Sequence, residues 1–348
     1  MLKNSALFLL AALALILHPT SQADEFSIVY KGSDGIGRGK HIVFIAADHE
    51  YRGEQTLPAL ARIMAKRYGF KCTVVFGTDP EDGTILPGSS HIGGLKILEK
   101  ADLMVLAMRF INMPDDEMQH FVDYVDRGGP IIGLRTSTHA FNIPKDRKFY
   151  SYHHTYPGKE FHKGFGRQVL GETWVTHYGD NHRQSSILMP EQANKKHPVL
   201  IGVKNMHTQA GGYTAYPLEP FTVIARGIIL NGMDIDAPVD TSKELMPVVW
   251  VRDYKSNSGK AARIFTTTQG ASEDITNEGF RRLLLNAHLW CLGMEDEIKA
   301  DNPVDFVGPY QPTTFSFSHF PRGVKPADLA DYDSPIMPEG LPLTKSEK

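Results

Sequence analysis

The sequence predicts an α/β fold with a mainly parallel β-sheet, and two patterns support that prediction. Short apolar segments that end abruptly at polar residues are typical of buried parallel strands. Segments with apolar residues at helical spacing lie between them. The predicted strands are 41–47, 71–76, 103–108 and 130–134, and the predicted helices are 56–68, 92–99 and 114–127. Strict alternation of strand and helix implies crossover connections, so these strands should run parallel.

The helices have local signals for their faces and ends. The first carries Leu57, Leu60 and Ile63 at the spacing of an amphipathic helix. The third opens with Pro114 followed by three acidic residues, which suit the first turn because of the helix dipole. Gly128 is placed to end it.

The rest of the chain departs from this alternation. Residues 142–212 are polar, aromatic and rich in histidine, and we interpret them as a lid insertion with short strands at 167–170 and 172–176. Strands at 222–225, 248–251 and 263–267 and a helix at 277–292 should complete the domain. The predicted organisation is a signal peptide (1–23), an N-terminal lead-in (24–40), the α/β domain (41–296) and a proline-rich, extended C-terminal tail (297–348) whose aromatic residues partly pin it to the body.

The first residues have the pattern of a secretory signal peptide. Lys3 precedes an apolar run from Ala6 to Leu17, and small residues lead to a cleavage site after Ala23. We therefore expect a periplasmic or secreted protein with no integral membrane span after cleavage. The alternative is an uncleaved anchor. A formal net charge of −3 and the lack of a basic run exclude nucleic acid as an expected partner.

The stretch GGPIIGLRTSTHAF, residues 128–141, is the clearest indication of a site. Its apolar run ends at Arg135, Thr136, Ser137, Thr138 and His139. Because carboxyl ends of parallel strands meet at one edge of a sheet, these residues should adjoin the ends of two other strands. The residues expected at those ends are Asp48, His49, Glu50 and Tyr51 after the first strand and Arg109 after the third. Such groups suit acid/base chemistry on a polar substrate.

Two arginines directly at strand ends need anions nearby, because a buried unpaired guanidinium costs several kcal/mol. Asp48 or Glu50 could supply them as an internal pair with Arg109 or Arg135. A ligand carboxylate or an enediolate-like oxyanion could also do so. The sequence leaves both open.

Histidines gather in the insertion, where eight of the fifteen in the chain lie between His139 and His207. Imidazoles and carboxylates are ligands for zinc or a similar divalent ion. The better metal candidates are His139, His177 and His49, near predicted strand ends, although no HExxH-type signature is present.

Other chemistry is disfavoured. No G-x-S-x-G surrounds the strand-to-helix elbow, so a serine hydrolase is not expected. Spaced glycines at 32–39 precede the first strand, which excludes a dinucleotide fingerprint. Cys72 and Cys291 are interpreted as core residues, and sequence cannot decide whether they form a disulfide.

Several segments resemble the trehalose-utilisation, or ThuA-like, family, which is similar in fold to class I glutamine amidotransferases. They are HIVFIAADHEY, RGGPIIGLRTSTHAF, HPVLIGV, MPVVWVRDY, ARIFTTTQGA and NEGFRRLLLNAHLWCLG. The resemblance implies a flavodoxin-like doubly wound sheet and a role in disaccharide or keto-sugar metabolism. Arg135-Thr136 stands where amidotransferases carry the nucleophilic cysteine, so glutaminase activity should be absent. Ala271 follows Gly270 where many members have histidine.

Two functions follow as hypotheses. The first is an exported enzyme (a hydrolase, lyase or isomerase) for a sugar or keto-sugar. In it His139 is the base or a metal ligand, Asp48 and His49 form a second acid/base element, and Arg109 and Arg135 stabilise an oxyanion. The substrate would be bound by Glu50, Tyr51, Ser137, His177 and Tyr178.

The second hypothesis is a non-catalytic carbohydrate-binding protein that stacks sugars on aromatic residues such as Tyr152, Tyr156, Trp174, Tyr178 and Tyr213. The sequence leaves the oligomeric state open.

Overall fold

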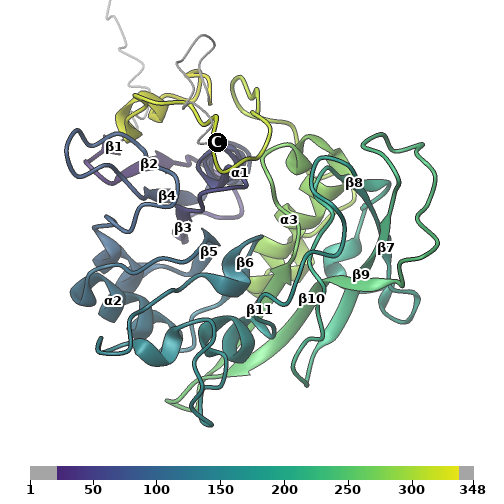
Figure 1. Ribbon diagram of the computed structural model, residues 1–348. Coiled ribbons are helices and arrows are strands. Elements are labelled where there is room, and N and C mark those ends of the chain that lie inside the picture. The colour runs from purple at the N-terminus through teal and green to yellow at the C-terminus, as the bar shows by residue number, and fades with distance from the viewer. Residues whose placement is uncertain (1–21, 337–348) are drawn as a thin grey trace, which may run out of the picture.

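The computed structural model describes residues 22–336 (Figure 1). The strands are β1 (Gln22–Ala23), β2 (Ser27–Lys31), β3 (His41–Ala47), β4 (Lys71–Phe76), β5 (Leu103–Met108), β6 (Ile131–Gly133), β7 (Ser186–Pro190), β8 (Met206–Thr208), β9 (Thr222–Ile229), β10 (Met246–Lys255) and β11 (Ala261–Thr267). The α-helices are α1 (Gly53–Tyr68), α2 (Asp115–Asp126) and α3 (Glu278–Cys291). Short 3-10 turns connect many of these elements.

One mixed sheet runs through the described residues in the order β1-β2-β4-β3-β5-β6-β11-β10-β9-β7-β8. The neighbours β4, β3, β5, β6 and β11 are parallel, and the strands outside them pair antiparallel. The predicted α/β class is therefore confirmed, but the sheet is mixed. Among the described residues, four of its strand pairings are parallel and six are antiparallel, so the prediction of a mainly parallel sheet holds only for the central strands. If the five parallel strands are numbered by their order along the chain, their order across the sheet is 2-1-3-4-5. The order reverses beside β3, where α/β sheets place a ligand crevice.

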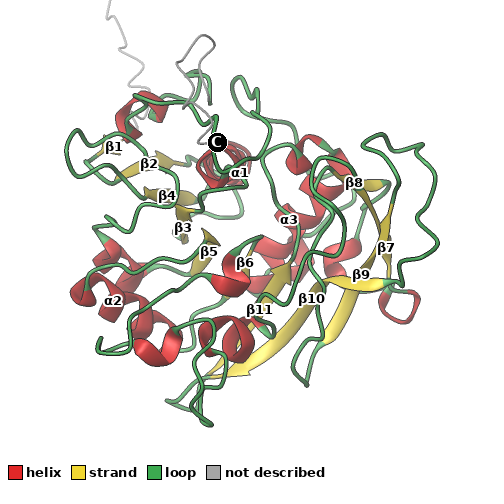
Figure 2. Ribbon diagram, in the orientation of Figure 1, coloured by secondary structure: helices red, strands yellow, loops and turns green. Residues whose placement is uncertain are grey.

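Helices cover both faces of the parallel strands, because alternate residues of each strand point to opposite sides. Ile42 and Phe44 of β3 pack in one core with Leu57 of α1 and Leu284 of α3. Their neighbours on the strand, such as Val43, join a second core with residues of α2. Figure 2 shows helices on either side of the central strands. Strands buried on both faces explain the continuous apolar runs in the sequence.

Several regions differ from the sequence predictions. The insertion contains the unpredicted strands β7 and β8, and the helix expected at 92–99 is a 3-10 helix at Leu95–Lys100. The lead-in contains β2, which pairs antiparallel with β4 and buries the alternate side chains of Ile28 and Tyr30. The expected strand at 167–170 is a π-helix, Gly166–Leu170, and no strand forms at 172–176. This π-helix packs directly against the segment after β6, since a Cβ at Gly166 would lie 1.8 Å from the Thr138 carbonyl oxygen.

The ends of the chain bear on several predictions. The segment predicted to be a signal peptide, 1–23, lies outside the described residues, apart from Gln22 and Ala23 in β1. The extension from 297 packs on the body as far as residue 336, and Phe315 is fully buried there. Cys72 and Cys291 are buried, free thiols. Within residues 22–336 no helix has both the length and the apolar character needed to cross a membrane.

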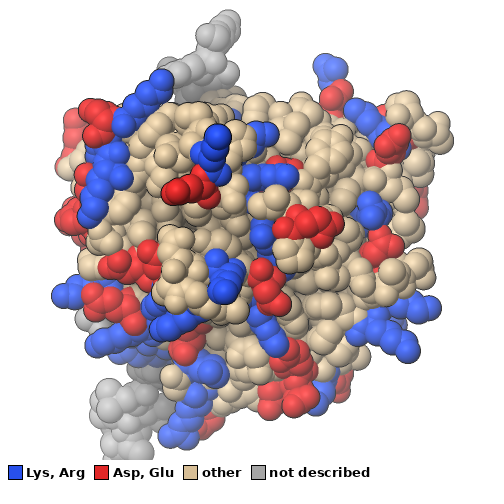
Figure 3. All heavy atoms as spheres, turned by 90° about the horizontal axis from the view of Figure 1, so that it is seen from below, with Lys and Arg blue, Asp and Glu red and all other residues tan. Residues whose placement is uncertain are grey.

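Charged side chains of both signs are interleaved over the face seen from below (Figure 3). No large basic area stands out on that face, which agrees with the near-neutral net charge of −3.

Candidate functional site

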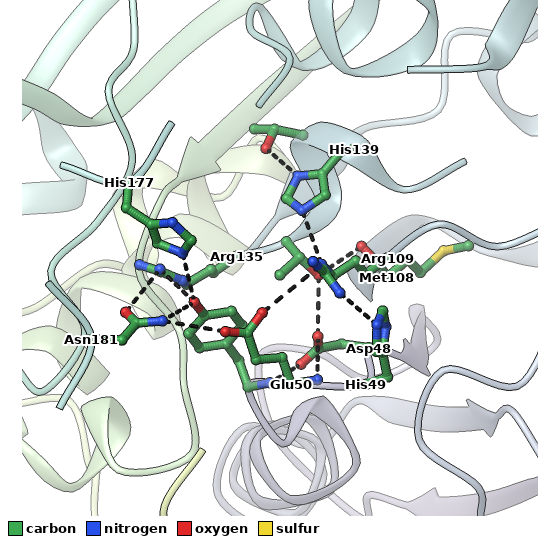
Figure 4. A network of polar contacts seen from close by, with 12 residues as sticks. Asp48, His49, Glu50, Met108, Arg109, Arg135, His139, His177 and Asn181 are labelled. Carbon is green, nitrogen blue, oxygen red and sulfur yellow. Dashed lines mark hydrogen bonds and ion pairs between the residues drawn. The ribbon is translucent and has the colours of Figure 1, made fainter. Parts of the chain in front are cut away.

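Three segments that follow neighbouring strands meet at the carboxyl edge of the sheet, as the sequence predicts (Figure 4). β3 leads into residues 48–51, β5 ends just before Arg109, and β6 leads into residues 135–139. β5 lies between β3 and β6, and the three are parallel, so their carboxyl ends are adjacent.

Asp48 orders the turn after β3. Its carboxylate accepts hydrogen bonds from the backbone N–H groups of Glu50 (3.1 Å) and Tyr51 (2.7 Å). The Thr136 hydroxyl lies 3.4 Å from the same carboxylate. The side chain is 1% exposed, and burial raises its pKa. Asp48 is predicted to be catalytic, but its carboxylate is hydrogen-bonded to the backbone of the turn that carries Glu50 and Tyr51.

Arg135 lies inside the protein between two tyrosine rings. Its guanidinium carbon is 4.0 Å from the ring centroids of both Tyr51 and Tyr213. It donates to the Tyr51 hydroxyl at 2.7 Å and to the Thr268 carbonyl oxygen at 3.2 Å. Aromatic faces stabilise a desolvated cation, so the two rings help to accommodate a side chain that is 1% exposed and whose buried Nε has no hydrogen-bond partner among the described residues. The sequence leaves open whether Arg135 has an internal partner or binds a ligand anion, and this arrangement favours an internal, structural role.

Arg109 is the centre of the polar cluster. Its Nε donates to His139 Nε2 at 3.3 Å, and its Nη1 bonds His49 Nε2. The Glu50 carboxylate lies 3.9 Å away, and the Phe110 ring centroid is 4.6 Å from the guanidinium carbon. The side chain is 17% exposed, in contrast to Arg135. Arg109 is thus a partly accessible cation with imidazoles on both of these nitrogens.

Both imidazoles bonded to Arg109 are neutral. A guanidinium has only donors, so each Nε2 facing it must hold a lone pair. The remaining ring nitrogen of His139, Nδ1, then donates to the Thr138 hydroxyl at 3.2 Å. Burial, followed by the charge of Arg109, lowers the pKa of His49 to about 4. The same two causes hold the pKa of His139 well below its usual value. Burial also raises the pKa of Glu50.

The insertion contributes the side chains that border this cluster. Asn181 donates to Glu50 at 3.2 Å and to the Tyr51 hydroxyl at 2.7 Å. His177 is exposed, and its Nε2 lies 3.4 Å from that hydroxyl. Trp174 is 39% exposed, with its ring centroid 6.0 Å from that of His139. Sequence reasoning missed Asn181, because nothing in its local pattern indicates a contact with a strand end 131 residues away.

Two predicted substrate-binding residues are bonded elsewhere. The Ser137 hydroxyl is fully buried and donates to the Leu106 carbonyl oxygen at 2.9 Å. The Tyr178 hydroxyl donates to the carbonyl oxygens of Gly227 and Glu244.

The five aromatic residues suggested for sugar stacking are also divided. Tyr213 is covered by Arg135, and Tyr152 packs against core rings such as Phe165. Of the five, Trp174 is the one that the structure places both at the cluster and in contact with solvent.

A divalent metal does not fit the predicted ligands. His139 and His177 flank the ring of Tyr213, each with a centroid distance of 5.6 Å. The Nε2 lone pair of His139 is directed at the cationic Arg109, which would repel a metal ion there. Across residues 22–336 no group of three or more His, Cys, Asp or Glu side chains is arranged to hold a metal.

No family model and no curated protein matches this chain. Among solved structures, one described as a ThuA-like protein, from Bacteroides uniformis, shares 15% sequence identity and a TM-score of 0.47, and the match covers 75% of this chain and 95% of that one. Another so described, from Parabacteroides merdae, shares 18% identity and a TM-score of 0.44, covering 80% of this chain and 96% of that one. Similarity at this level carries no conclusion about activity, which depends on the side chains of the site.

Proposed function

We propose that the protein is an exported, ThuA-like enzyme that moves a proton beside the carbonyl group of a keto-sugar, such as an oxidised disaccharide. The observation that carries the proposal is the position of Arg109 between the neutral imidazoles of His49 and His139. A neutral imidazole can accept a proton, and a fixed cation stabilises charge that develops on oxygen. The strand order supports the flavodoxin-like, doubly wound sheet that belongs to this proposal.

The proposed step is a proton abstraction. A carbonyl oxygen of the sugar replaces one imidazole as an acceptor for Arg109, which frees the Nε2 lone pair of that histidine. The imidazole takes the proton from the adjacent carbon. The C–H electron pair forms a carbon–carbon double bond, and the carbonyl π electrons move to oxygen. The resulting enediolate oxygen accepts hydrogen bonds from the N–H groups of Arg109. We assign the base to His139, with His49 as the second acid/base group.

Glutaminase chemistry has no support in the site. The elbow carries Arg135 and Thr136, while Cys72 lies in β4 and Cys291 in α3, both buried in the core. Burial raises the pKa of both thiols, which opposes formation of a nucleophilic thiolate.

Deuterium exchange tests the proposed step directly. A 3-keto-disaccharide is incubated with the protein from residue 24 onward in D2O, and loss of the proton signals beside the carbonyl is followed by NMR. We expect exchange well above the buffer rate, reduced by about 100-fold or more in Arg109→Gln and His139→Asn. Arg147→Gln, which removes a surface arginine paired with Asp115, is the matched control and should exchange normally. Exchange at the buffer rate across a panel of 3-keto-disaccharides would contradict the proposal.

A carbohydrate-binding protein without activity is the second candidate. The observation that favours it is that both imidazole lone pairs, the Asp48 carboxylate and the Tyr51 hydroxyl already have partners within the protein. The exposed Trp174 beside His139 would then serve binding alone. Saturable binding by calorimetry without deuterium exchange would identify this function.

A further inference from the structure

The C-terminal extension passes directly over the candidate site. We call residues 313–320 the C-terminal strap, which belongs to the yellow part of the chain beside α1 in Figure 1. Gln55 at the start of α1 accepts from the Thr313 backbone N–H at 2.9 Å and donates to its hydroxyl at 2.7 Å. The strap is therefore attached to the same turn-and-helix unit that follows β3.

The strap is fixed on both sides of Phe317. On one side Phe315 is fully buried, with its ring stacked on Tyr51 at a centroid distance of 5.0 Å. The Ser316 backbone N–H donates to the Glu50 carbonyl oxygen at 2.8 Å. On the other side Arg52 donates to the Ser318 carbonyl oxygen at 2.7 Å. These contacts leave the backbone at Phe317 little freedom.

Phe317 is nevertheless 56% exposed. Its ring centroid lies 4.8 Å from the guanidinium carbon of Arg109 and 5.3 Å from the ring centroid of His49. What distinguishes Phe317 from other exposed apolar side chains is its position on Arg109 and His49, where its open side borders the candidate site. The Phe110 ring centroid lies 4.6 Å from the same guanidinium carbon, so two phenylalanine rings contact Arg109. Its Nε–H and Nη1–H groups remain directed at the two histidines.

We propose that Phe317 is a ligand-binding residue whose exposed side stacks on the apolar face of one pyranose ring of a disaccharide, while the other sugar of that disaccharide places an oxygen at Arg109. The C-terminal extension thereby completes the site instead of only covering the body. This inference rests on the proposed function, because it takes the ligand to be a sugar. A planar aromatic ring suits this contact, since pyranose rings present C–H groups on one face and aromatic side chains combine apolar area with a fixed plane.

Substitutions at Phe317 test the inference through the same deuterium exchange assay. In Phe317→Ala we expect KM for the 3-keto-disaccharide to rise about tenfold while kcat stays within about threefold, because stacking is made equally in ground and transition states. Phe317→Leu keeps apolar volume without a flat face and should behave similarly. Phe317→Trp keeps a flat aromatic ring, so its KM should stay close to that of the wild type. Ile235→Ala removes an apolar side chain of similar exposure (45%) from the β9–β10 loop and is the matched control.

Each outcome decides the matter. A raised KM in the Ala and Leu variants with rescue by Trp supports the inference. An unchanged KM in Phe317→Ala, in a protein whose wild type exchanges deuterium, overturns it and leaves the proposed function standing. No exchange by the wild type overturns the proposed function and this inference together. Near-UV circular dichroism of each variant separates loss of binding from loss of fold.

Discussion

Arg109 and Arg135 follow neighbouring strands of one sheet, yet their surroundings differ. Arg135 is 1% exposed and lies between two tyrosine rings, with its N–H groups directed at a hydroxyl and a carbonyl oxygen. Arg109 is 17% exposed and bonds two neutral imidazoles. Two aromatic rings contact each guanidinium, so the difference lies in exposure and in hydrogen-bond partners. The partners of Arg135 are a buried hydroxyl and a backbone carbonyl oxygen, whereas a ligand can replace the imidazole partners of the partly exposed Arg109. We therefore assign Arg135 to the fold and Arg109 to the chemistry.

The largest effect should come from the histidine bonded to Arg109 Nε. His139→Asn keeps a polar side chain at the strand end but removes the proposed base. We expect turnover to fall by about 10²- to 10⁴-fold with little change in the unfolding midpoint. Deuterium exchange and thermal unfolding measure the two quantities. Equal exchange by wild type and variant would remove His139 from the mechanism.

The tyrosines around Arg135 should affect stability. Tyr213→Leu keeps an apolar side chain but removes one of the two ring faces that stabilise the buried guanidinium. We expect the free energy of unfolding to fall by about 2 kcal/mol. Urea denaturation measures it, and Tyr156→Leu, at a partly exposed tyrosine of the insertion, is the control. A loss no greater than that of the control would mean that the rings do not stabilise Arg135.

The pH dependence of turnover should reflect Arg109. Burial and the charge of Arg109 lower the pKa of His49 to about 4 in the folded protein. The ring is therefore neutral above that pH and becomes protonated as pH falls through it. We expect kcat/KM to be retained down to pH 5 and lost near pH 4. An acid limb near the ordinary histidine value of about 6.5 would show that burial and Arg109 do not lower the pKa of His49, the second acid/base group.

The smallest effects should come from predicted site residues whose hydroxyls bond the backbone elsewhere. Ser137→Ala and Tyr178→Phe remove donors to the carbonyl oxygens of Leu106 and of Gly227 and Glu244. We expect stability to fall by about 1 kcal/mol in each and turnover to stay within about twofold. A loss of turnover comparable with that of His139→Asn would return these residues to the site.

The sequence predicts the residues at the carboxyl ends of the central strands well, because each follows directly on its strand in the sequence. Continuous apolar runs indicate β3, β5 and β6, and the polar residues directly after them mark Asp48, Arg109 and Arg135. The roles of the two arginines are not encoded in this way. They depend on Tyr213 for Arg135 and on Phe317 for Arg109, each distant along the chain. The short strand β2 escapes prediction because only two of its residues, Ile28 and Tyr30, show the alternation.

The most direct test compares Arg109→Gln with Arg135→Gln in both deuterium exchange and urea unfolding. The account predicts that Arg109→Gln loses exchange by about 100-fold while its unfolding free energy changes by less than about 1 kcal/mol. It predicts that Arg135→Gln loses about 3 kcal/mol of stability, because buried polar partners are left unpaired. A stable but inactive Arg135→Gln beside a fully active Arg109→Gln would contradict the division of roles between the two arginines.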